Sequence, residues 1–217
     1  MLVLVAAVAG CGLSAPASDD GGAAPPGAPT GPTTVGAATA ELQALAVKGR
    51  APRTGYSRER FGPSWRDVDR NGCDTRNDVL ARDLVEETLR PGTQGCVVLS
   101  GTLADPYTGR TLQFRKSDPS EVQIDHVVAL SDAWQTGAQQ WSPNRRLAFA
   151  NDPRNLQATD GGTNQQKGDA DAASWLPPNR GYRCTYVSRQ IDVKAAYGLW
   201  VTRAERDAMT RVLSSCE

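Results

Sequence analysis

The chain has 217 residues, and its 24 Lys and Arg residues balance 24 Asp and Glu residues, so the formal net charge is zero. Zero net charge excludes a protein that holds nucleic acid by bulk charge alone, although a local basic groove is still compatible with it. No apolar run reaches the roughly 20 residues that a membrane-spanning helix needs. We therefore expect one globular domain that does not span a membrane.

The first segment of the chain is apolar and ends at a cysteine. Residues 1–11 (MLVLVAAVAGC) have the length of a signal-peptide core, and the residues before Cys11 resemble the lipobox of bacterial lipoproteins, whose cysteine is lipidated. Cleavage after Ala17 is the competing interpretation, and both interpretations export the protein. Residues 12–40 are mostly Gly, Ala, Pro, Ser and Thr, which predicts a disordered linker. A lipid at Cys11 would be the protein's only attachment to a membrane.

Residues 41–217 are expected to form the folded domain. Hydrophobic spacing and stop signals predict helices at residues 41–49, 77–90, from 164 to about 175–178, and 202–214. Alternating or short apolar runs bounded by turns predict strands at residues 96–101, 111–114, from 122, and 155–158.

An acidic loop precedes the second predicted helix. Asp67, Asp69 and Asn71 match the start of a calcium-binding loop, and Asp78 stands at the twelfth position, where such loops use a bidentate Glu. Cys73 in the middle of this loop indicates an alternative, a tight turn pinned by a disulfide. The sequence of this loop fits both interpretations.

Four cysteines lie within the predicted domain: Cys73, Cys96, Cys184 and Cys216. An even number in an exported chain predicts two disulfides, and three pairings are possible. We favour the sequence-local pairing, Cys73–Cys96 with Cys184–Cys216. A zinc site is disfavoured because the chain has no CxxC pair and one histidine, His126.

The residue types that carry chemistry are concentrated between positions 125 and 167. Asp125 and His126 are an ionisable pair inside an otherwise apolar strand, which is costly unless both have partners. Asn155 lies in the next short strand. Asn164 and Lys167 are three positions apart at the start of a helix, so they share one helix face.

These residues carry a family resemblance. The segments IDHVVAL (124–130), NL (155–156) and NQQKGD (164–169) resemble the HNH, or ββα-metal, nuclease signature. The chain is most similar to exported actinobacterial-type HNH endonucleases related to the C-terminal domain of the GmrSD restriction enzymes, and the likeness covers residues 41–217. It implies an α+β fold, with a ββα-metal core, additional helices, a small antiparallel sheet and stapling disulfides.

The resemblance also implies a role for each residue of the motif. His126 is the general base that takes a proton from water, and Asn155 orients its ring. Asp125 and Asn164 hold one divalent metal, and Lys167 lies near the scissile phosphate as a positive charge. Because both metal ligands are oxygen donors, we expect Mg²⁺ rather than zinc, with Mn²⁺ able to substitute.

Four arginines are further candidates for contact with the substrate. Arg145, Arg146 and Arg154 lie between the two halves of the motif, where they contact either the nucleic-acid backbone or only solvent. Arg76 reaches the phosphate if its loop folds over the site, a placement that the family likeness implies. The expected partner is nucleic acid, with DNA favoured over RNA, and no protein partner is predicted.

The sequence therefore favours a metal-dependent endonuclease that hydrolyses phosphodiester bonds at the cell surface or outside the cell. The alternative is a non-catalytic surface lipoprotein that retains the HNH fold as a binding module, stabilised by calcium at Asp67 and Asp69. A binding module has no need of Asp125, His126, Asn155 and Asn164 together, and the presence of all four favours the enzyme.

Overall fold

The computed structural model describes residues 34–216 of the chain. The predicted signal segment, the lipidation of Cys11 and residues 12–33 of the predicted linker lie outside the described residues. Between residues 34 and 216 the protein has an α+β fold with small antiparallel sheets among its helices, as the sequence predicts. No helix in this part is both long and apolar enough to cross a bilayer.

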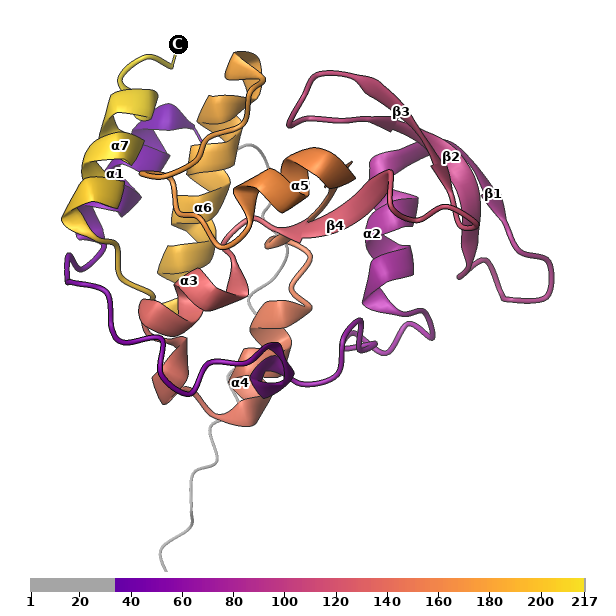
Figure 1. Cartoon of the computed structure of the whole chain (residues 1–217), viewed down its shortest axis with the longest axis horizontal. Coiled ribbons are helices and arrows are strands. Elements are labelled where there is room, and N and C mark those ends of the chain that lie inside the picture. The colour runs from indigo at the N-terminus through magenta and orange to yellow at the C-terminus, as the bar shows by residue number, and fades with distance from the viewer. Residues whose placement is uncertain (1–33, 217) are drawn as a thin grey trace, which may run out of the picture.

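Three helices form a layer on one side of the molecule (Figure 1): α1 (Val35–Ala44), α6 (Arg183–Tyr197) and α7 (Arg203–Leu213). Their facing sides are apolar and share one core, in which Leu42, Ile191 and Met209 are almost completely buried. The disulfide Cys184–Cys216 joins the start of α6 to the chain after α7, which confirms this predicted bridge.

Helix α1 begins earlier than predicted. Thr34 is its N-cap, and the Thr34 hydroxyl accepts a hydrogen bond from the Ala37 amide. Ala38 and Leu42, one turn apart, are both buried in the core. The prediction of a disordered linker is therefore wrong over residues 35–40, because small apolar residues there pack against α6 and α7.

Helix α6 was not predicted at all. Its inward side carries polar as well as apolar residues, so the helical spacing of apolar residues is interrupted. Gln190 donates a hydrogen bond to the Val127 carbonyl, and Lys194 donates to Asp132 on another helix. Tertiary partners make this mixed face stable inside the protein, and the sequence alone does not reveal those partners.

A three-stranded antiparallel sheet forms the other side of the molecule (Figure 1), in the order β1 (Leu84–Leu89), β2 (Val98–Ala104) and β3 (Thr111–Arg115). Helix α2 (Thr75–Asp83) precedes β1, so the predicted helix over residues 77–90 is wrong after Asp83. The backbone of residues 84–89 pairs with β2 instead, through a register irregularity between Val85 and Thr88. The hydrogen bonds that residues 84–89 form with β2 therefore decide the structure of this segment, although its apolar residues recur at helical spacing.

The disulfide Cys73–Cys96 joins the loop before α2 to the segment before β2. This confirms the second predicted bridge. It fixes the position of α2 relative to the sheet, and the buried Asn77 adds a hydrogen bond from the Val98 amide to its side-chain oxygen.

The centre of the molecule holds a second, two-stranded sheet. Strand β4 (Val122–His126) pairs antiparallel with β5 (Leu156–Asp160), and α5 (Gly161–Lys167) follows directly and packs on both strands. Both strands agree with the predicted ones. Helix α5 ends at Lys167 rather than near residues 175–178, because Gly168 takes a positive φ of 53°.

The turn from β5 into α5 has no space for a side chain. A Cβ atom on Gly161 would lie 2.0 Å from the Ser120 carbonyl oxygen, so glycine is required for this close approach. The segment between the strands contributes α3 (Leu130–Gln135) and α4 (Pro143–Ala150). Short 3₁₀ turns complete the fold: η1 (Arg58–Phe61), η2 (Ala138–Gln140) and η3 (Arg180–Tyr182).

Candidate active site

His126 is the last residue of β4 and is 7% exposed. Its Nε2 atom lies 2.9 Å from the Ala150 carbonyl oxygen, at the end of α4. Because a carbonyl oxygen only accepts hydrogen bonds, the neutral ring must carry its proton on Nε2. Nδ1 has no hydrogen-bond partner within residues 34–216, so its lone pair is free to accept a proton from water.

Burial lowers the pKa of His126 to about 4, and the positive charges of Arg58 and Lys167 act in the same direction. The indole of Trp65 contributes to this burial by stacking on the imidazole, with an interplanar angle of 13° and ring centroids 6.4 Å apart. The ring is therefore neutral at physiological pH, which is the state that a general base requires.

The carboxylate of Asp125 accepts hydrogen bonds at both of its oxygens. Lys167 Nζ lies 2.9 Å from Oδ1, and the Tyr107 hydroxyl donates to Oδ2 at 2.5 Å. The Lys167 ammonium also donates to the His126 backbone carbonyl. Lys167 is 2% exposed and holds the Asp125 carboxylate and the end of β4 in place, while its position near a scissile phosphate stays a prediction.

Asn155 lies just before β5, and its contacts differ from the predicted role. Its side-chain oxygen accepts from the Val128 amide at 2.7 Å, and its side-chain nitrogen donates to the Val128 carbonyl at 3.2 Å. It therefore pins the loop after His126. The ring contact predicted for Asn155 is made by the Ala150 carbonyl instead.

Asn164, on the first turn of α5, lines the same pocket as Asp125 and His126. Its side-chain nitrogen donates to the Gln123 side-chain oxygen at 3.0 Å, and this leaves the side-chain oxygen Oδ1 of Asn164 available. The pocket has a volume of about 200 Å³. Tyr56 and Arg58 also line it.

The residues present fit a small hard cation better than zinc. Asp125 and Asn164 offer oxygen donors to one pocket, and each oxygen of an ionised carboxylate keeps a lone pair after accepting one hydrogen bond. Such a site leaves room for several water ligands, which Mg²⁺ retains. Zinc would find at most one nitrogen ligand there, the His126 ring.

Three of the predicted substrate-binding arginines are committed to other parts of the protein. Arg146 is 8% exposed and donates to three carbonyl oxygens of the protein backbone. The predicted contact of Arg146 with the nucleic-acid backbone is therefore wrong. Arg145 donates to the Tyr197 carbonyl, and Arg154 forms an ion pair with Asp152 at 2.6 Å. The fourth, Arg76, lies over the Phe114 ring at 6.0 Å, and burial lowers its pKa.

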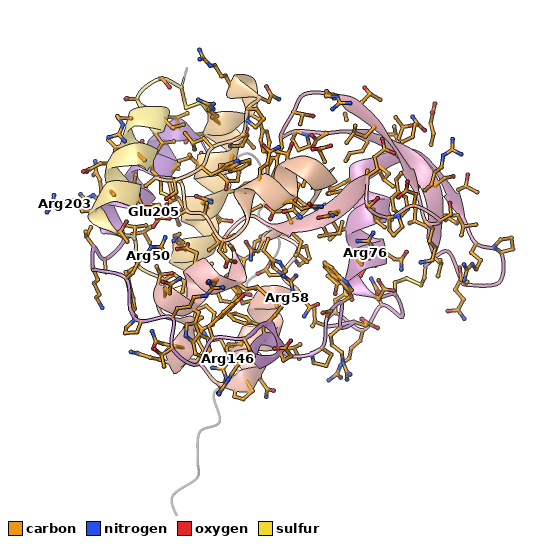
Figure 2. All side chains as sticks on the ribbon, in the orientation of Figure 1. Arg50, Arg58, Arg76, Arg146, Arg203 and Glu205 are labelled. Atoms are coloured by element: carbon orange, nitrogen blue, oxygen red, sulfur yellow. A yellow bond between two sulfur atoms is a disulfide. The ribbon has the colours of Figure 1, made fainter. Side chains whose placement is uncertain are left out.

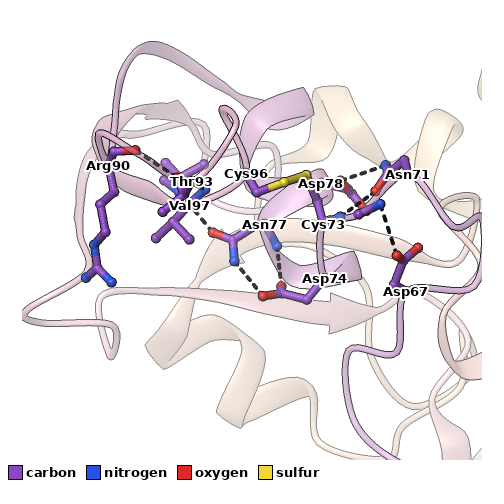
Figure 3. Close-up of a disulfide and its surroundings, with 12 residues drawn as sticks. Asp67, Asn71, Cys73, Asp74, Asn77, Asp78, Arg90, Thr93, Cys96 and Val97 are labelled. Carbon is purple, nitrogen blue, oxygen red and sulfur yellow. Dashed lines mark hydrogen bonds between the residues drawn. A yellow bond between two sulfur atoms is a disulfide. The ribbon is translucent and has the colours of Figure 1, made fainter.

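The acidic loop before α2 is closed by its own hydrogen bonds (Figure 3). The Asn71 side-chain nitrogen donates to both Asp69 and Asp78, and Asp67 accepts from a backbone amide of the same loop. The carboxylate oxygens of Asp67, Asp69 and Asp78 do not all lie within 4.8 Å of one another. These contacts are those of the disulfide-pinned turn, and calcium binding stays a prediction.

Three residues near the site escaped the sequence analysis as functional candidates: Arg58, Trp65 and Tyr107. Arg58 and Trp65 both border His126, and Tyr107 bonds Asp125. Trp65 has a positive φ of 59°, which is costly for a bulky residue and is typical of functional sites. The density of aromatic and basic residues over positions 56–65 is the sequence signal that could have found Arg58 and Trp65.

Comparison with known proteins assigns the family. The family described as GmrSD restriction endonucleases, C-terminal domain, matches residues 74–212, so the chain belongs to it. An uncharacterized secreted protein of Arthroderma benhamiae is 41% identical over 198 residues, which cover 89% of this chain and 93% of that protein. No solved structure shows significant similarity to the chain.

Proposed function

We propose that the protein is an exported, Mg²⁺-dependent endonuclease that hydrolyses phosphodiester bonds of nucleic acid, with DNA favoured. One observation carries the proposal. A buried, neutral histidine with a free Nδ1 lies beside two oxygen donors, Asp125 and Asn164, in a single pocket. Membership of a family of restriction endonuclease domains supports it. In this reading β4, β5 and α5 form the ββα-metal core.

The residues divide the chemistry among them. His126 accepts a proton from water at Nδ1, while its Nε2–H group donates a hydrogen bond to the Ala150 carbonyl. This hydrogen bond keeps the ring oriented with Nδ1 toward the water during the proton transfer. Asp125 and Asn164 would hold the cation, which, when bound, supplies a Lewis acid for the phosphate oxygens. Lys167 and Tyr107 are positioning residues, since they fix the Asp125 carboxylate.

The protein is exported. Its two disulfides, Cys73–Cys96 and Cys184–Cys216, are typical of oxidising compartments. The relative from Arthroderma benhamiae, which matches over nearly its whole length, is named a secreted protein. The substrate therefore lies outside the cell, and attachment through a lipid at Cys11 stays part of the proposal.

The testing experiment uses the chain produced under oxidising conditions. Plasmid DNA, single-stranded DNA and RNA are incubated with it in Mg²⁺, with and without EDTA. We expect cleavage of DNA that EDTA abolishes and that His126→Ala lowers by about 10²- to 10⁴-fold, the range of a general base. No cleavage of any substrate by folded protein in Mg²⁺ or Mn²⁺ would reject the endonuclease and favour the binding module.

A matched pair of variants tests the cation site. Asn164→Ala removes a proposed ligand, whereas Gln165→Ala removes an exposed amide one position further along the same helix. We expect Asn164→Ala alone to raise the Mg²⁺ concentration needed for half-maximal cleavage. Equal behaviour of the two variants would exclude Asn164 as a ligand.

A further inference from the structure

The pocket around His126 contains one positively charged side chain that the proposed mechanism does not use. Of the ten residues that line this pocket, Arg58 is the single Lys or Arg. Arg58 also lines the smaller pocket on the Trp65 side of the His126 ring. It is therefore the cation that borders the histidine from both directions, and it lies near the centre of the view in Figure 2, whereas Arg203 lies at the edge.

The guanidinium of Arg58 is not used by the protein itself. Within residues 34–216 it makes no ion pair and no side-chain hydrogen bond, and the residue is exposed. The other cation of the site, Lys167, is buried on Asp125, and Arg146 on α4 gives its donors to backbone carbonyls. Arg58 thus keeps its full set of five N–H donors for a ligand.

The backbone that carries Arg58 is rigidly placed. Arg58 opens η1, whose last residue, Phe61, is 1% exposed and packs against Tyr56, Trp134 and Phe149. Gly62, directly after η1, has a φ of 85°, and a Cβ atom there would lie 2.8 Å from Leu147 Cδ1. The chain is therefore held tightly against α4, which fixes the backbone of Arg58 beside the pocket that Asn164 of α5 also lines.

An acceptor of suitable chemistry is a tetrahedral anion with two free oxygens. A guanidinium binds such an anion through two parallel hydrogen bonds. The pocket already contains the proposed base and the proposed cation ligands, so the anion that reaches all of them at once is a phosphodiester. Resting on the proposed function, we propose that Arg58 binds the non-bridging oxygens of the scissile phosphodiester.

This role differs from a general attraction of nucleic acid by surface charge. A bidentate contact depends on the fork of the guanidinium, so lysine replaces it incompletely. It also depends on the anionic oxygens of one phosphate, so replacing that phosphate by an uncharged group should weaken the contact. Both properties can be measured separately from the loss of one positive charge.

The test compares three variants of the full chain. Arg58→Gln removes the charge and the fork, and Arg58→Lys removes the fork alone. Arg60→Gln is the matched control: Arg60 lies two positions away on η1, is exposed, and lines neither pocket beside His126. Thermal melting establishes that each variant is folded.

The first readout is kcat/KM for cleavage of DNA in Mg²⁺. We expect about a 10- to 100-fold loss for Arg58→Gln, the size of a charge-assisted hydrogen bond to a phosphate, and a smaller loss for Arg58→Lys. Arg60→Gln should stay within about twofold of the unmodified protein. Equal losses in Arg58→Gln and Arg60→Gln would overturn the proposal in favour of bulk charge.

The second readout is binding and uses the His126→Ala background, in which we expect cleavage to be about 10²- to 10⁴-fold slower. Each variant is titrated with a short DNA duplex that carries either natural phosphates or uncharged methylphosphonates. Replacing the anionic oxygens should weaken binding to Arg58-containing protein and change it much less in Arg58→Gln. An equal response of both proteins would overturn the proposal, while cleavage that depends on His126 would leave the proposed function standing.

Discussion

The protein buries two Lys–Asp ion pairs that look alike in isolation. Lys167 contacts Asp125 at 2.9 Å, and Lys194 contacts Asp132 at 2.8 Å, with both lysine side chains fully buried. Removing two charges from water is costly, so each pair requires further partners to be tolerated. The partners are what distinguish the two pairs.

The Lys194 pair is part of a closed network of charges. Glu205 binds the same ammonium at 2.9 Å, and Arg50 bridges Asp132 and Asp171 at 2.8 and 2.7 Å. Figure 2 shows Arg50 and Glu205 within the helical layer. These three carboxylates form the single cluster of metal-ligand type found within residues 34–216, and Arg50 and Lys194 already occupy it.

The Lys167 pair borders an open pocket instead. Asp125 lines it together with His126 and Asn164, and the ammonium is shared with a backbone carbonyl rather than a second carboxylate. Burial of an ion pair is therefore a structural cost in both places, and access to a pocket decides which of the two pairs can act on a ligand.

The largest effect is expected from breaking each pair with the same substitution. Lys194→Met and Lys167→Met each leave a buried carboxylate uncompensated, so each should lower the free energy of unfolding by about 3–5 kcal/mol. Only Lys167→Met should also lower the specific activity per folded molecule. Urea unfolding together with DNA cleavage, measured under conditions where both variants are folded, distinguishes the two outcomes. Loss of activity in folded Lys194→Met would contradict the comparison.

A pH-dependent effect is expected from the closed network. Burial raises the pKa of Glu205 to about 7, with a further contribution from Asp132, although Lys194 opposes the shift. A carboxyl group with a raised pKa in the folded state stabilises the fold below its unfolded value of 4.5, and that stability is lost as the pH rises through 7. The change amounts to roughly 3 kcal/mol at most.

The measurement is chemical denaturation at several values between pH 4.5 and pH 8, with Glu205→Gln beside the unmodified protein. The variant has no carboxyl group at this position, so the difference in stability between the two proteins should grow in favour of Glu205→Gln as the pH rises. A difference that does not change with pH would show that Glu205 is ionised throughout.

The smallest effect concerns the Lys167–Asp125 pair, which borders the pocket. Tyr107→Phe removes the hydroxyl that donates to Asp125 and leaves the ring packed among Trp175, Tyr182 and Tyr186. We expect a loss of about 1 kcal/mol in stability, the net value of one buried hydrogen bond. Cleavage should fall about tenfold, because one Asp125 oxygen is no longer held. Tyr186→Phe, which changes another buried tyrosine of the same cluster, should leave cleavage unaltered.

The polar motif of the site could be read from the sequence because its residues lie in short, local segments. Asp125 and His126 are adjacent on a strand that was predicted at nearly its observed position, and Asn164 and Lys167 lie three positions apart on one helix. The contacts of Lys167 with Asp125, and of Asn155 with the loop after His126, were not predicted. Spacing does not show whether a charged group faces a pocket or a buried carboxylate.

The aromatic and basic residues around His126 could not be assigned in the same way. Arg58 and Trp65 lie 68 and 61 positions before His126 in the chain, and they reach the histidine because η1 packs against α4. Arg146 lies close to the motif in the sequence and was therefore expected at the substrate. In the structure it is buried, and its guanidinium donates to three backbone carbonyls. Distance along the chain was a poor guide to contact in both cases.

The sequence predicted two disulfides with the favoured pairing, the two central strands, the final helix and the polar residues of the candidate site, since each of these depends on local pattern or on residue type. Only the tertiary structure decided that residues 84–89 form a strand, that α6 exists, and which of two buried lysines borders a pocket. Those outcomes depend on partners distant in the chain, because a backbone edge, a polar helix face or a buried charge is stable only where a complementary group meets it.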